Sequence, residues 1–414
     1  MNSQISDIRY QISARPKVAL VYDRVNTPHG GAEKVLLALH QLYPNAPLYT
    51  SVYDAKRAKW AKVFKIKTSF LQKIPFAKNH HRYLAWLMPL AFETLDLSEY
   101  DLIISVTSAE AKGIITRANQ LHICYLLTPT RYLYSHKQNY LGSLPKIPLL
   151  SNLATCLLNH LKNWDQIAAH RSDVIIPISN LVKKRAKQYY GVETERVIYP
   201  AVSQTSNIQY PISKQLQNSK YQIPKNYYLV ISRLVSYKRI DLAIKACQKL
   251  NKKLIIVGQG PELNKLKKLA RNSKFQMPNA KPISNIKYPI SFLNSIPKKQ
   301  IINLLQNCKG LLMPGLEDFG ITALETANQN VPVIIHEKSG VAEILKNYPK
   351  AIFTKSESVL NLINAIKKSE SKKIQNNQGF ENKTIYNTSY FLKEFSSTIE
   401  RLYANHKTQT SNFS

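Results

Sequence analysis

The chain has 414 residues, of which 44% are hydrophobic and 20% are charged. A chain of this size is too large for one core and too apolar to be intrinsically disordered, so we expect two compact domains. Its 58 lysines and arginines against 25 aspartates and glutamates give a net charge of +33. A field of that sign attracts phosphate groups, so the candidate partners are nucleic acid, anionic membrane and phosphorylated substrates.

The four cysteines are scattered, with no Cys-x-x-Cys motif and no grouped histidines. This pattern argues against a zinc site or a disulfide framework and favours a reducing, cytosolic setting. The N-terminal residues lack the apolar core of a signal peptide. The longest uncharged run, residues 147–161, is interrupted by polar residues and a proline, and it falls short of the ~18–20 residues that span a bilayer. We therefore expect no membrane-spanning segment.

Short apolar runs rich in β-branched residues alternate with longer helical patterns from residue 17 onward, as in repeated βα units around parallel sheets. In the first half, strands are predicted at residues 17–22, 47–52, 101–106, 122–127, 173–178 and 196–200. In the second half, they are predicted at residues 227–232, 253–258, 310–314 and 331–335. The predicted fold class is therefore α/β, with ligands bound outside the carboxyl ends of the strands, in a cleft between the two domains.

Composition also predicts the domain boundaries. Residues 201–226 are polar and contain prolines, as linkers do, and residues 272–289 resemble an exposed loop. Near the C-terminus, Ser389 is a possible N-cap of a helix whose apolar face carries Phe391, Phe395, Ile399 and Leu402. The predicted segments are an N-terminal extension at 1–16, domains at 17–200 and 227–385, a linker at 201–226, a packing helix at 386–404 and a tail at 405–414.

Glycine is scarce, and seven of the twelve glycines follow predicted strands or open predicted helices. Gly30 and Gly31 begin a helix whose free N–H groups would suit a phosphate. A tight turn is the alternative, because Glu33 in the first turn equally fits ordinary compensation of the helix dipole. The pair Gly258 and Gly260 lacks the third glycine of a dinucleotide fingerprint, which argues against a nicotinamide enzyme.

Two cations follow the first strand of the second half. Arg233 and Lys238 lie between a buried strand and a helix, so both can reach a ligand from one loop. Arginine supplies a rigid fork and lysine a point charge, a combination that stabilises a departing diphosphate. Alternatively, these cations are only solvated surface charges of a basic protein. That interpretation is stronger for the neighbouring Arg239 than for Arg233 and Lys238.

The segment "LLMPGLEDFGITALETANQNVPVII", residues 311–335, carries the most specific signal. Glu317 lies in the loop after a strand, Gly320 opens a helix, and Glu325 follows in its second turn. The loop can present Glu317 to a ligand while the helix start offers N–H groups to phosphate. Glu325 is either a solvent-facing helix residue or a partner of ribose hydroxyls.

These motifs together resemble the retaining glycosyltransferases of family 4, which have the GT-B fold of two Rossmann-like domains facing across a cleft. The similarity includes Gly-Gly-Ala-Glu at 30–33, "SRLVSYK" at 232–238, "GQGP" at 258–261 and "EDFGITALE" at 317–325, and it extends over roughly residues 17–400. The most similar subgroup contains mannosyltransferase-like enzymes of bacterial surface polysaccharide assembly, lipopolysaccharide included.

The resemblance implies roles for individual residues. Glu317 would contact the donor sugar, Glu325 would hold the ribose, and Arg233 with Lys238 would bind the donor diphosphate. Arg233, Lys238 and Glu317 are the expected catalytic residues. The other expected donor-binding residues are Gly30, Gly31, Gly258, Gly260, Phe319, Gly320 and Ile321. The resemblance implies a GDP- or UDP-sugar as co-substrate, with no cofactor and no metal ion, because cations and helix ends take the place of the metal.

The chain departs from the subgroup at four positions. Ser108 and Leu127 stand where histidines are usual, and the second of these histidines normally lies beside the reacting sugar. Asn330 replaces a glycine, which is benign because asparagine is the next-best residue in a left-handed helix cap. Ser339 also stands where glycine is common.

Positive charge is concentrated in residues 55–92, which contain nine lysines or arginines and no acidic residue before Glu93. Seven aromatic residues are interleaved with these cations: Trp60, Phe64, Phe70, Phe76, Tyr83, Trp86 and Phe92. This composition suits the surface of an anionic membrane. Single-stranded nucleic acid would also fit, as would a basic face whose aromatic rings turn into the core. We favour the membrane, because sugar transfer implies an acceptor that is often lipid-linked.

The expected function is transfer of a hexose, with mannose from GDP-mannose as one option, to a saccharide or lipid-linked saccharide with retention at the anomeric carbon, in cell-surface polysaccharide biosynthesis. The expected location is cytoplasmic and peripheral, on the inner face of the cytoplasmic membrane, with no nucleic acid partner. The alternative is a degenerate GT-B protein that binds nucleotide sugar or polysaccharide without turnover. Ser108 and Leu127 favour this alternative, and the intact Glu317 and Glu325 oppose it.

Overall fold

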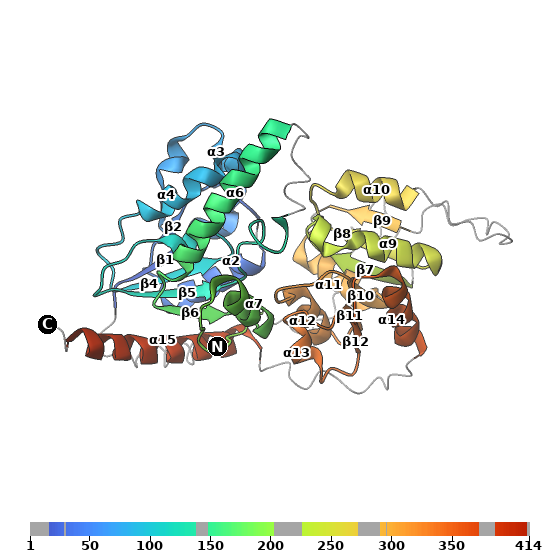
Figure 1. Ribbon diagram of the computed structural model, residues 1–414. Helices are drawn as coiled ribbons and strands as arrows, with labels where there is room; N and C mark the ends of the chain where they lie inside the picture. Colours follow the sequence, from blue (N-terminus) through green and yellow to red (C-terminus); the bar gives the residue numbers. More distant parts are fainter. Residues whose placement is uncertain are drawn as a thin grey trace. The chain divides into compact units, whose positions relative to one another are not determined.

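The computed structural model describes residues 16–28, 30–137, 148–202, 226–271, 290–294, 296–371 and 386–411. The chain forms two compact units: Met1–Val202 together with Ile385–Ser414, and Ser203–Thr384. Each unit contains one parallel sheet with helices packed around it (Figure 1). Among the described residues, no helix is long and apolar enough to cross a bilayer.

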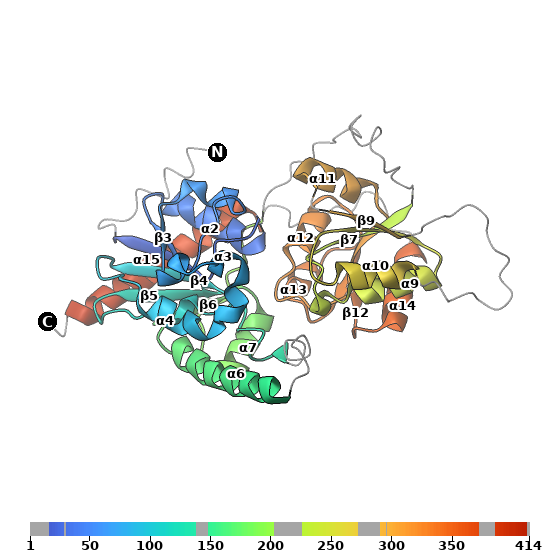
Figure 2. The same ribbon diagram turned by 90° about the horizontal axis from the view of Figure 1, so that it is seen from above.

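The sheet of the first unit has the strand order β3-β2-β1-β4-β5-β6. These strands are β1 (Val18–Tyr22), β2 (Leu48–Thr50), β3 (Ile66–Thr68), β4 (Leu102–Thr107), β5 (Leu121–Leu126) and β6 (Val174–Pro177). Its helices include α2 (Gly31–Leu42), α3 (Ala77–His80), α4 (Met88–Glu93), α6 (Pro148–Ala169) and α7 (Asn180–Tyr190). The C-terminal helix α15 (Thr388–Ser411) returns to this unit (Figure 2). There, Phe391 and Phe395 pack edge-on against Tyr125 of β5.

The sheet of the second unit has the order β12-β11-β10-β7-β8-β9. These strands are β7 (Tyr227–Ile231), β8 (Lys253–Val257), β9 (Ile290–Leu293), β10 (Gly310–Met313), β11 (Val333–His336) and β12 (Ala351–Thr354). Its helices are α9 (Ile240–Lys249), α10 (Leu263–Arg271), α11 (Lys298–Asn307), α12 (Ile321–Asn328), α13 (Ala342–Leu345) and α14 (Val359–Ser371).

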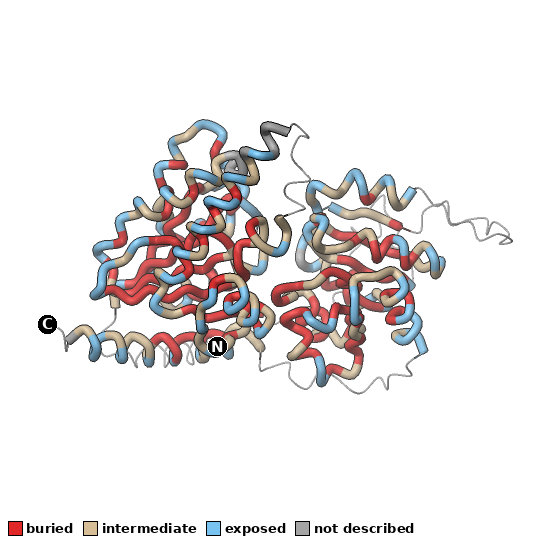
Figure 3. The backbone as a smooth tube through the Cα atoms, in the orientation of Figure 1, coloured by how far each residue is buried: buried red, intermediate tan, exposed pale blue. Residues whose placement is uncertain are grey.

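The central strands are buried along their whole length, which explains their uninterrupted apolar sequences (Figure 3). Parallel sheets bury both faces because crossover helices cover them. In the second unit, α9 and α14 pack against each other and against the sheet. The two parallel sheets with flanking helices confirm the predicted α/β fold class.

Each sheet has one point where the direction of its crossovers reverses. In the second unit, the chain moves from β7 to β8 and β9 on one side, and from β10 to β11 and β12 on the other. The switch point therefore lies between β7 and β10. The corresponding point of the first unit lies between β1 and β4. Loops that follow the strands at such points are the usual ligand sites of open α/β sheets.

The structure corrects several predicted elements. The predicted strand at 196–200 is not a strand. Ile198 donates its backbone N–H to the carbonyl oxygen of Pro177 at 3.2 Å, but its own carbonyl oxygen accepts a hydrogen bond from the Tyr125 hydroxyl. Pro200 has no N–H that could continue a ladder of backbone hydrogen bonds. Helix α15 is capped by the Asn387 side chain, which accepts the N–H of Tyr390, and not by Ser389. The short strands β3, β9 and β12 were not predicted. The expected loop at 272–289 and the linker, apart from residues 201, 202 and 226, lie outside the described residues.

Candidate functional site

The two loops expected to bind a donor follow the neighbouring strands β7 and β10. The first loop, 232–239, carries Arg233 and Lys238, and the second, 314–320, carries Glu317. Because β7 and β10 flank the switch point, their carboxyl ends bring these side chains together. The Lys238 ammonium donates a hydrogen bond to the Glu317 carboxylate, and both side chains are largely buried, at 15% and 11% exposed. The sequence-predicted cation and acid thus form one ion pair.

Arg233 lies on the exposed side of the same loop. Its guanidinium donates to the hydroxyl of Tyr237 at 2.7 Å, and the ammonium of Lys238 lies 5.4 Å from the centre of the Tyr237 ring. Tyr237 therefore contacts both cations. The exposed guanidinium has further in-plane N–H groups that can donate to an anion.

Hydrogen bonds from the neighbouring loop hold the Glu317 backbone. Its N–H donates to the hydroxyl of Ser339 at 3.1 Å, and its carbonyl accepts the N–H of Gly340 at 3.0 Å. Phe319 is buried, and its carbonyl accepts the N–H of Val341 at 2.8 Å. Ser339, whose effect sequence could not define, is therefore a direct partner of the candidate acid.

Glycines allow the loops of this site to pack backbone against backbone. A Cβ added at Gly315 would lie 2.4 Å from the Tyr237 carbonyl oxygen. Added at Gly258 or Gly260, it would lie 1.9 Å from Ser232 O or 2.3 Å from Leu234 O. All three distances are far below van der Waals contact. The loop with Arg233 and Lys238 is thus enclosed on both sides by glycine loops, which gives Gly258 and Gly260 a packing role that needs no ligand.

The start of α12 holds the remaining predicted donor residues of this unit. Gly320 has φ 107°, a left-handed conformation that glycine adopts without strain, and Ile321 begins the helix. Glu325 follows in the second turn and is half-buried. Asn330, after the helix, has φ 61°, which agrees with the expected left-handed position.

In the first unit, the loop after β1 leads into α2 through Gly30 and Gly31. Glu33 is buried here and accepts hydrogen bonds from the hydroxyls of Tyr22 at 3.1 Å and Thr27 at 3.2 Å. Burial raises the pKa of the Glu33 carboxyl above its ordinary value. Glu33 is therefore part of a buried network at the helix start and not a solvated residue that compensates the dipole.

Asp23 joins the two loops at the switch point of the first unit. Its buried carboxylate accepts hydrogen bonds from the Thr107 hydroxyl at 2.6 Å, the Ser108 N–H at 2.8 Å and the Ala111 N–H at 3.0 Å. The Ser108 hydroxyl also donates to it, at 3.2 Å. Ser108 therefore serves the internal structure of this loop. Leu127, at the end of β5, is half-buried.

A buried ion pair ties the same region to α6. Lys112 and Asp165 are each 1% exposed and contact one another, and the hydroxyl of Thr130 donates to Asp165 at 2.7 Å. Burial alone would lower the pKa of Lys112, but the Asp165 carboxylate holds it above its ordinary value. The pair fixes the loops after β4 and β5 to one helix.

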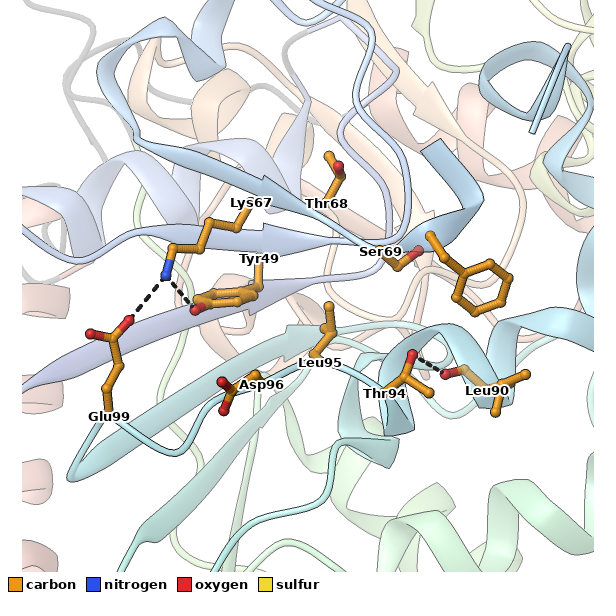
Figure 4. Close-up of a pocket in the computed structure, with 10 residues that line it drawn as sticks. Tyr49, Lys67, Thr68, Ser69, Leu90, Thr94, Leu95, Asp96 and Glu99 are labelled. Atoms are coloured by element: carbon orange, nitrogen blue, oxygen red, sulfur yellow. Dashed lines mark hydrogen bonds and ion pairs between the residues drawn. The ribbon is translucent and has the colours of Figure 1, made fainter. Parts of the chain in front are cut away.

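The described part of the first unit also has an open cavity of about 790 Å³ beside the edge strand β3 (Figure 4). At one end, the Lys67 ammonium contacts the Tyr49 hydroxyl at 2.8 Å and Glu99 at 3.0 Å. Phe70 and Leu90 contribute apolar surface to the lining. The cavity is therefore amphipathic and lies outside the loops discussed above.

The basic segment 55–92 distributes its aromatic residues between core and surface. Phe64 and Phe92 are buried, whereas Phe70, Phe76 and Trp86 are 36%, 77% and 55% exposed. The indole of half-buried Trp60 donates to the Thr27 carbonyl at 3.1 Å, and the Tyr83 side chain lies outside the described residues. Neither an entirely inward nor an entirely outward arrangement of the rings describes this segment.

Sequence reasoning missed Arg239 and Glu357. Arg239, expected to be solvated surface charge, pairs with Glu357 at 3.0 Å, and Glu357 also accepts the N–H of Leu316 at 2.9 Å. No sequence signal marks Glu357, which lies 40 residues after Glu317 in an unremarkable loop. Among the described residues, no group of three or more histidine, cysteine or acidic side chains could hold a metal ion.

Solved structures similar to this chain show the fold of the whole molecule. Anabaena HepE in complex with UDP aligns over 96% of this chain and 100% of its own, with a TM-score of 0.58 and 16% identity. WaaG, a glycosyltransferase involved in lipopolysaccharide biosynthesis, aligns over 92% of this chain and 99% of its own, with a TM-score of 0.62 and 15% identity. These similarities show the fold alone, which is GT-B.

Sequence comparison is more specific for part of the chain. Alpha-1,3/1,6-mannosyltransferase ALG2 of Kluyveromyces lactis is 30% identical over 212 residues, which cover 44% of this chain and 42% of that protein. The match thus spans less than half the length of this curated relative. Residues 213–386 match the family model described as "Glycosyl transferases group 1". The stretch of this GT-B chain that is similar to group 1 glycosyltransferases therefore includes the loops that carry Arg233, Lys238 and Glu317.

Proposed function

We propose that this protein is a retaining glycosyltransferase that transfers a hexose from a nucleotide sugar to a saccharide or lipid-linked saccharide. The observation that carries the proposal is the Lys238–Glu317 pair at the switch point of the second sheet, with Arg233 beside it. A cationic group for a leaving diphosphate and an acid for the sugar lie in contact there, within the stretch that is similar to group 1 glycosyltransferases.

In this proposal, Arg233 and Lys238 bind the donor diphosphate, and Glu317 contacts the sugar that it carries. Negative charge develops on the diphosphate as its bond to the sugar breaks, and preorganised cations stabilise that charge. Glu325 binds the ribose, and the start of α12 at Gly320 and Ile321 receives phosphate oxygens. The two cations and the helix end act here without a metal ion.

The donor and pathway of the proposal follow the relatives. A mannosyltransferase shares 30% identity with part of the chain, so mannose from GDP-mannose is the first sugar to test, and UDP-sugars are the second because a similar structure contains UDP. Cell-surface polysaccharide assembly is the proposed pathway, and family 4 with its mannosyltransferase-like subgroup is the proposed classification.

The rival function is binding without turnover. It is supported by the hydrogen bonds that commit the Ser108 hydroxyl and N–H to Asp23, and by the apolar side chain of Leu127 at the end of β5. Leu127 thus removes the polar group expected beside the reacting sugar, and Ser108 replaces the other usual histidine. Donor binding with no transfer to any acceptor would select this rival.

The proposal includes peripheral association with an anionic membrane surface, on its cytoplasmic side, through residues 55–92. Exposed lysines in this segment alternate with the exposed rings of Phe70, Phe76 and Trp86. Beneath them, Leu71, Ala77, Met88 and Ala91 form a small core that holds the segment in place. Cations beside apolar side chains are the composition that anionic lipid surfaces attract.

Donor binding is the first test of this function. Arg233→Ala and Lys238→Ala should each weaken binding of UDP or GDP by ~1.5–3 kcal/mol, the value of a hydrogen bond to a charged group. Calorimetric titration of the full chain measures this change. Lys252→Ala is the matched control, because Lys252 pairs with Glu370 at the amino end of β8, away from the donor loops. Unchanged affinity in both donor-loop variants would exclude the proposed site.

A further inference from the structure

One carboxylate in the second unit contacts the neighbours of both central donor residues. Glu357 lies in the loop between β12 and α14. One of its oxygens accepts the backbone N–H of Leu316 at 2.9 Å, and the other pairs with the guanidinium of Arg239 at 3.0 Å. Leu316 immediately precedes Glu317, and Arg239 immediately follows Lys238. The carboxylate therefore bridges the two loops at one residue from each member of the ion pair.

The conformation of Arg239 shows that its side chain has a structural task. Arg239 has φ 50°, in the left-handed region that favours glycine or asparagine. Its guanidinium contacts two carboxylates, those of Glu357 and Asp241. The side chain of Arg239 is 33% exposed and that of Glu357 is 31%, so this network is partly shielded from solvent.

The two loops that Glu357 bridges also touch through their backbones. Gly315 packs so closely on Tyr237 and Lys238 that a Cβ there would lie 2.4–2.9 Å from their backbone atoms. This contact prevents the loops from approaching further, and the Glu357 bridge prevents them from separating. Together they fix the distance between the backbones that carry Lys238 and Glu317.

We infer that Glu357, acting through Arg239 and the Leu316 amide, is a positioning residue that holds the diphosphate-binding loop and the sugar-binding loop in register. The inference rests on the proposed function of Lys238 and Glu317. Glu357 itself touches neither of these side chains in the contacts described above. Its effect should appear in turnover more than in nucleotide affinity, because the nucleotide keeps its proposed contacts with Arg233 and Glu325, whereas transfer also requires a fixed separation between Lys238 and Glu317.

Two variants separate the contact of Glu357 with the Leu316 N–H from its contact with the Arg239 guanidinium. Glu357→Gln keeps an oxygen that can accept the Leu316 N–H but removes the charge that pairs with Arg239. Glu357→Ala removes both contacts. Glu370→Gln is the matched control, since Glu370 is 30% exposed and forms an ion pair with Lys252 at the opposite end of the sheet.

Amide hydrogen exchange of the full chain measures the coupling without any ligand. In Glu357→Ala, exchange should accelerate at Leu316 and also at Lys238 and Arg239, whose N–H groups bond Val235 and Ser236. In Glu357→Gln, it should accelerate at Lys238 and Arg239 more than at Leu316. Glu370→Gln should change none of the three. Acceleration confined to Leu316 would overturn the inference.

Kinetics supplies the functional readout. We expect kcat for transfer from the nucleotide sugar to fall about tenfold in Glu357→Ala, because small misplacements of reacting groups are costly, while UDP affinity changes by less than about threefold. Equal losses of kcat and UDP affinity, or an equal loss in Glu370→Gln, would reduce Glu357 to a stabilising residue and overturn the inference. A parent protein that binds no nucleotide would refute the proposed function instead, and the exchange data would still decide whether Glu357 couples the loops.

Discussion

Glu317 has two possible partners, which compete. In the structure its carboxylate neutralises Lys238, whereas during transfer Lys238 is proposed to bind the diphosphate and Glu317 the sugar. Binding of a bare nucleoside diphosphate therefore has to displace Glu317 from Lys238. Such competition lowers the affinity for a bare diphosphate. The lost binding free energy is offset only when the donor also carries a sugar that contacts Glu317.

Glu317→Gln should separate these effects. The variant leaves Lys238 without its counter-charge, so UDP or GDP should bind at least about fivefold more tightly, since even a solvent-exposed ion pair is worth up to ~1 kcal/mol. Transfer should fall, because the contact with the reacting sugar is weakened. Calorimetry and initial rates measure the two quantities. Glu325→Gln is the comparison, with a loss of nucleotide affinity expected, and parallel losses of affinity and rate in both variants would contradict the division of roles.

Individual residues also show where sequence reasoning is limited. Arg233, Lys238 and Glu317 could be identified because each follows a buried strand in a recognisable motif. Ser339 and Glu357 could not, because their importance comes from partners 22 and 41 residues away, Glu317 and Leu316. Such contacts depend on which strands are neighbours in the sheet, and local sequence patterns do not predict the strand order.

At the level of elements, the central strands are predictable, whereas three of the four edge strands, β3, β9 and β12, are not. β4 and β5 have six residues each, buried on both faces, so their apolar runs are long and uninterrupted. β3 at the edge of the first sheet has three residues, all half-buried, with the sequence Ile-Lys-Thr. A strand of that length and composition is indistinguishable from a loop until its neighbour β2 is known.

The Lys112–Asp165 pair should make the contact between the β4 loop and α6 sensitive to single changes. Lys112→Met should lower the free energy of unfolding by about 3–5 kcal/mol, because it leaves the buried Asp165 carboxylate without its counter-charge. The double variant Lys112→Met with Asp165→Leu should recover most of this loss. Urea unfolding measures both. A double variant as unstable as the single one would show that the pair itself, and not the orphaned charge, supports the fold.

Buried His122 should make the first sheet acid-sensitive. It lies within β5 and forms a 2.8 Å hydrogen bond with Ser105, and burial lowers its pKa from 6.5 to about 4. Between these values the unfolded chain binds a proton that the folded chain does not, so stability falls as pH drops from 6.5 toward 4. The loss should approach about 3 kcal/mol, since each pKa unit is worth about 1.4 kcal/mol.

Unfolding free energies of the parent and of His122→Gln, measured from pH 7 to pH 4, test this dependence. The variant should have a flatter profile over that range. If the variant does not fold, NMR titration of the imidazole in the parent gives the same information. An imidazole that titrates near 6.5 in the folded protein would contradict the expectation.

For the whole molecule, sequence could predict the α/β class and the loops that carry the candidate donor residues. Sequence could not predict which of the cations behind the +33 net charge are available to a partner, because that depends on which of them are already paired within the protein. Lys67 illustrates the point. It belongs to the basic segment, yet its ammonium is bound by Tyr49, Tyr100 and Glu99 beside β3. It therefore cannot be counted among the cations available to a lipid surface without loss of those contacts.

The membrane proposal predicts that the protein sediments with anionic vesicles and much less with neutral ones. The cations to change are Lys59, Lys62, Lys65 and Lys73, which are exposed. Each lysine near an anionic surface contributes about 1 kcal/mol, so replacing four with glutamine should release most of the protein at physiological salt. The matched control replaces Lys265, Lys267, Lys268 and Arg271 of α10 with glutamine, which changes net charge equally in the other unit.

Equal release of both variants would mean that total charge and not the basic segment drives binding. Retention of both would mean that the exposed rings or another surface attach the protein to the vesicle. If the first variant is released but still transfers sugar to a soluble acceptor, docking and chemistry reside in different units, as expected when the basic segment lies in Met1–Val202 and the donor loops in Ser203–Thr384.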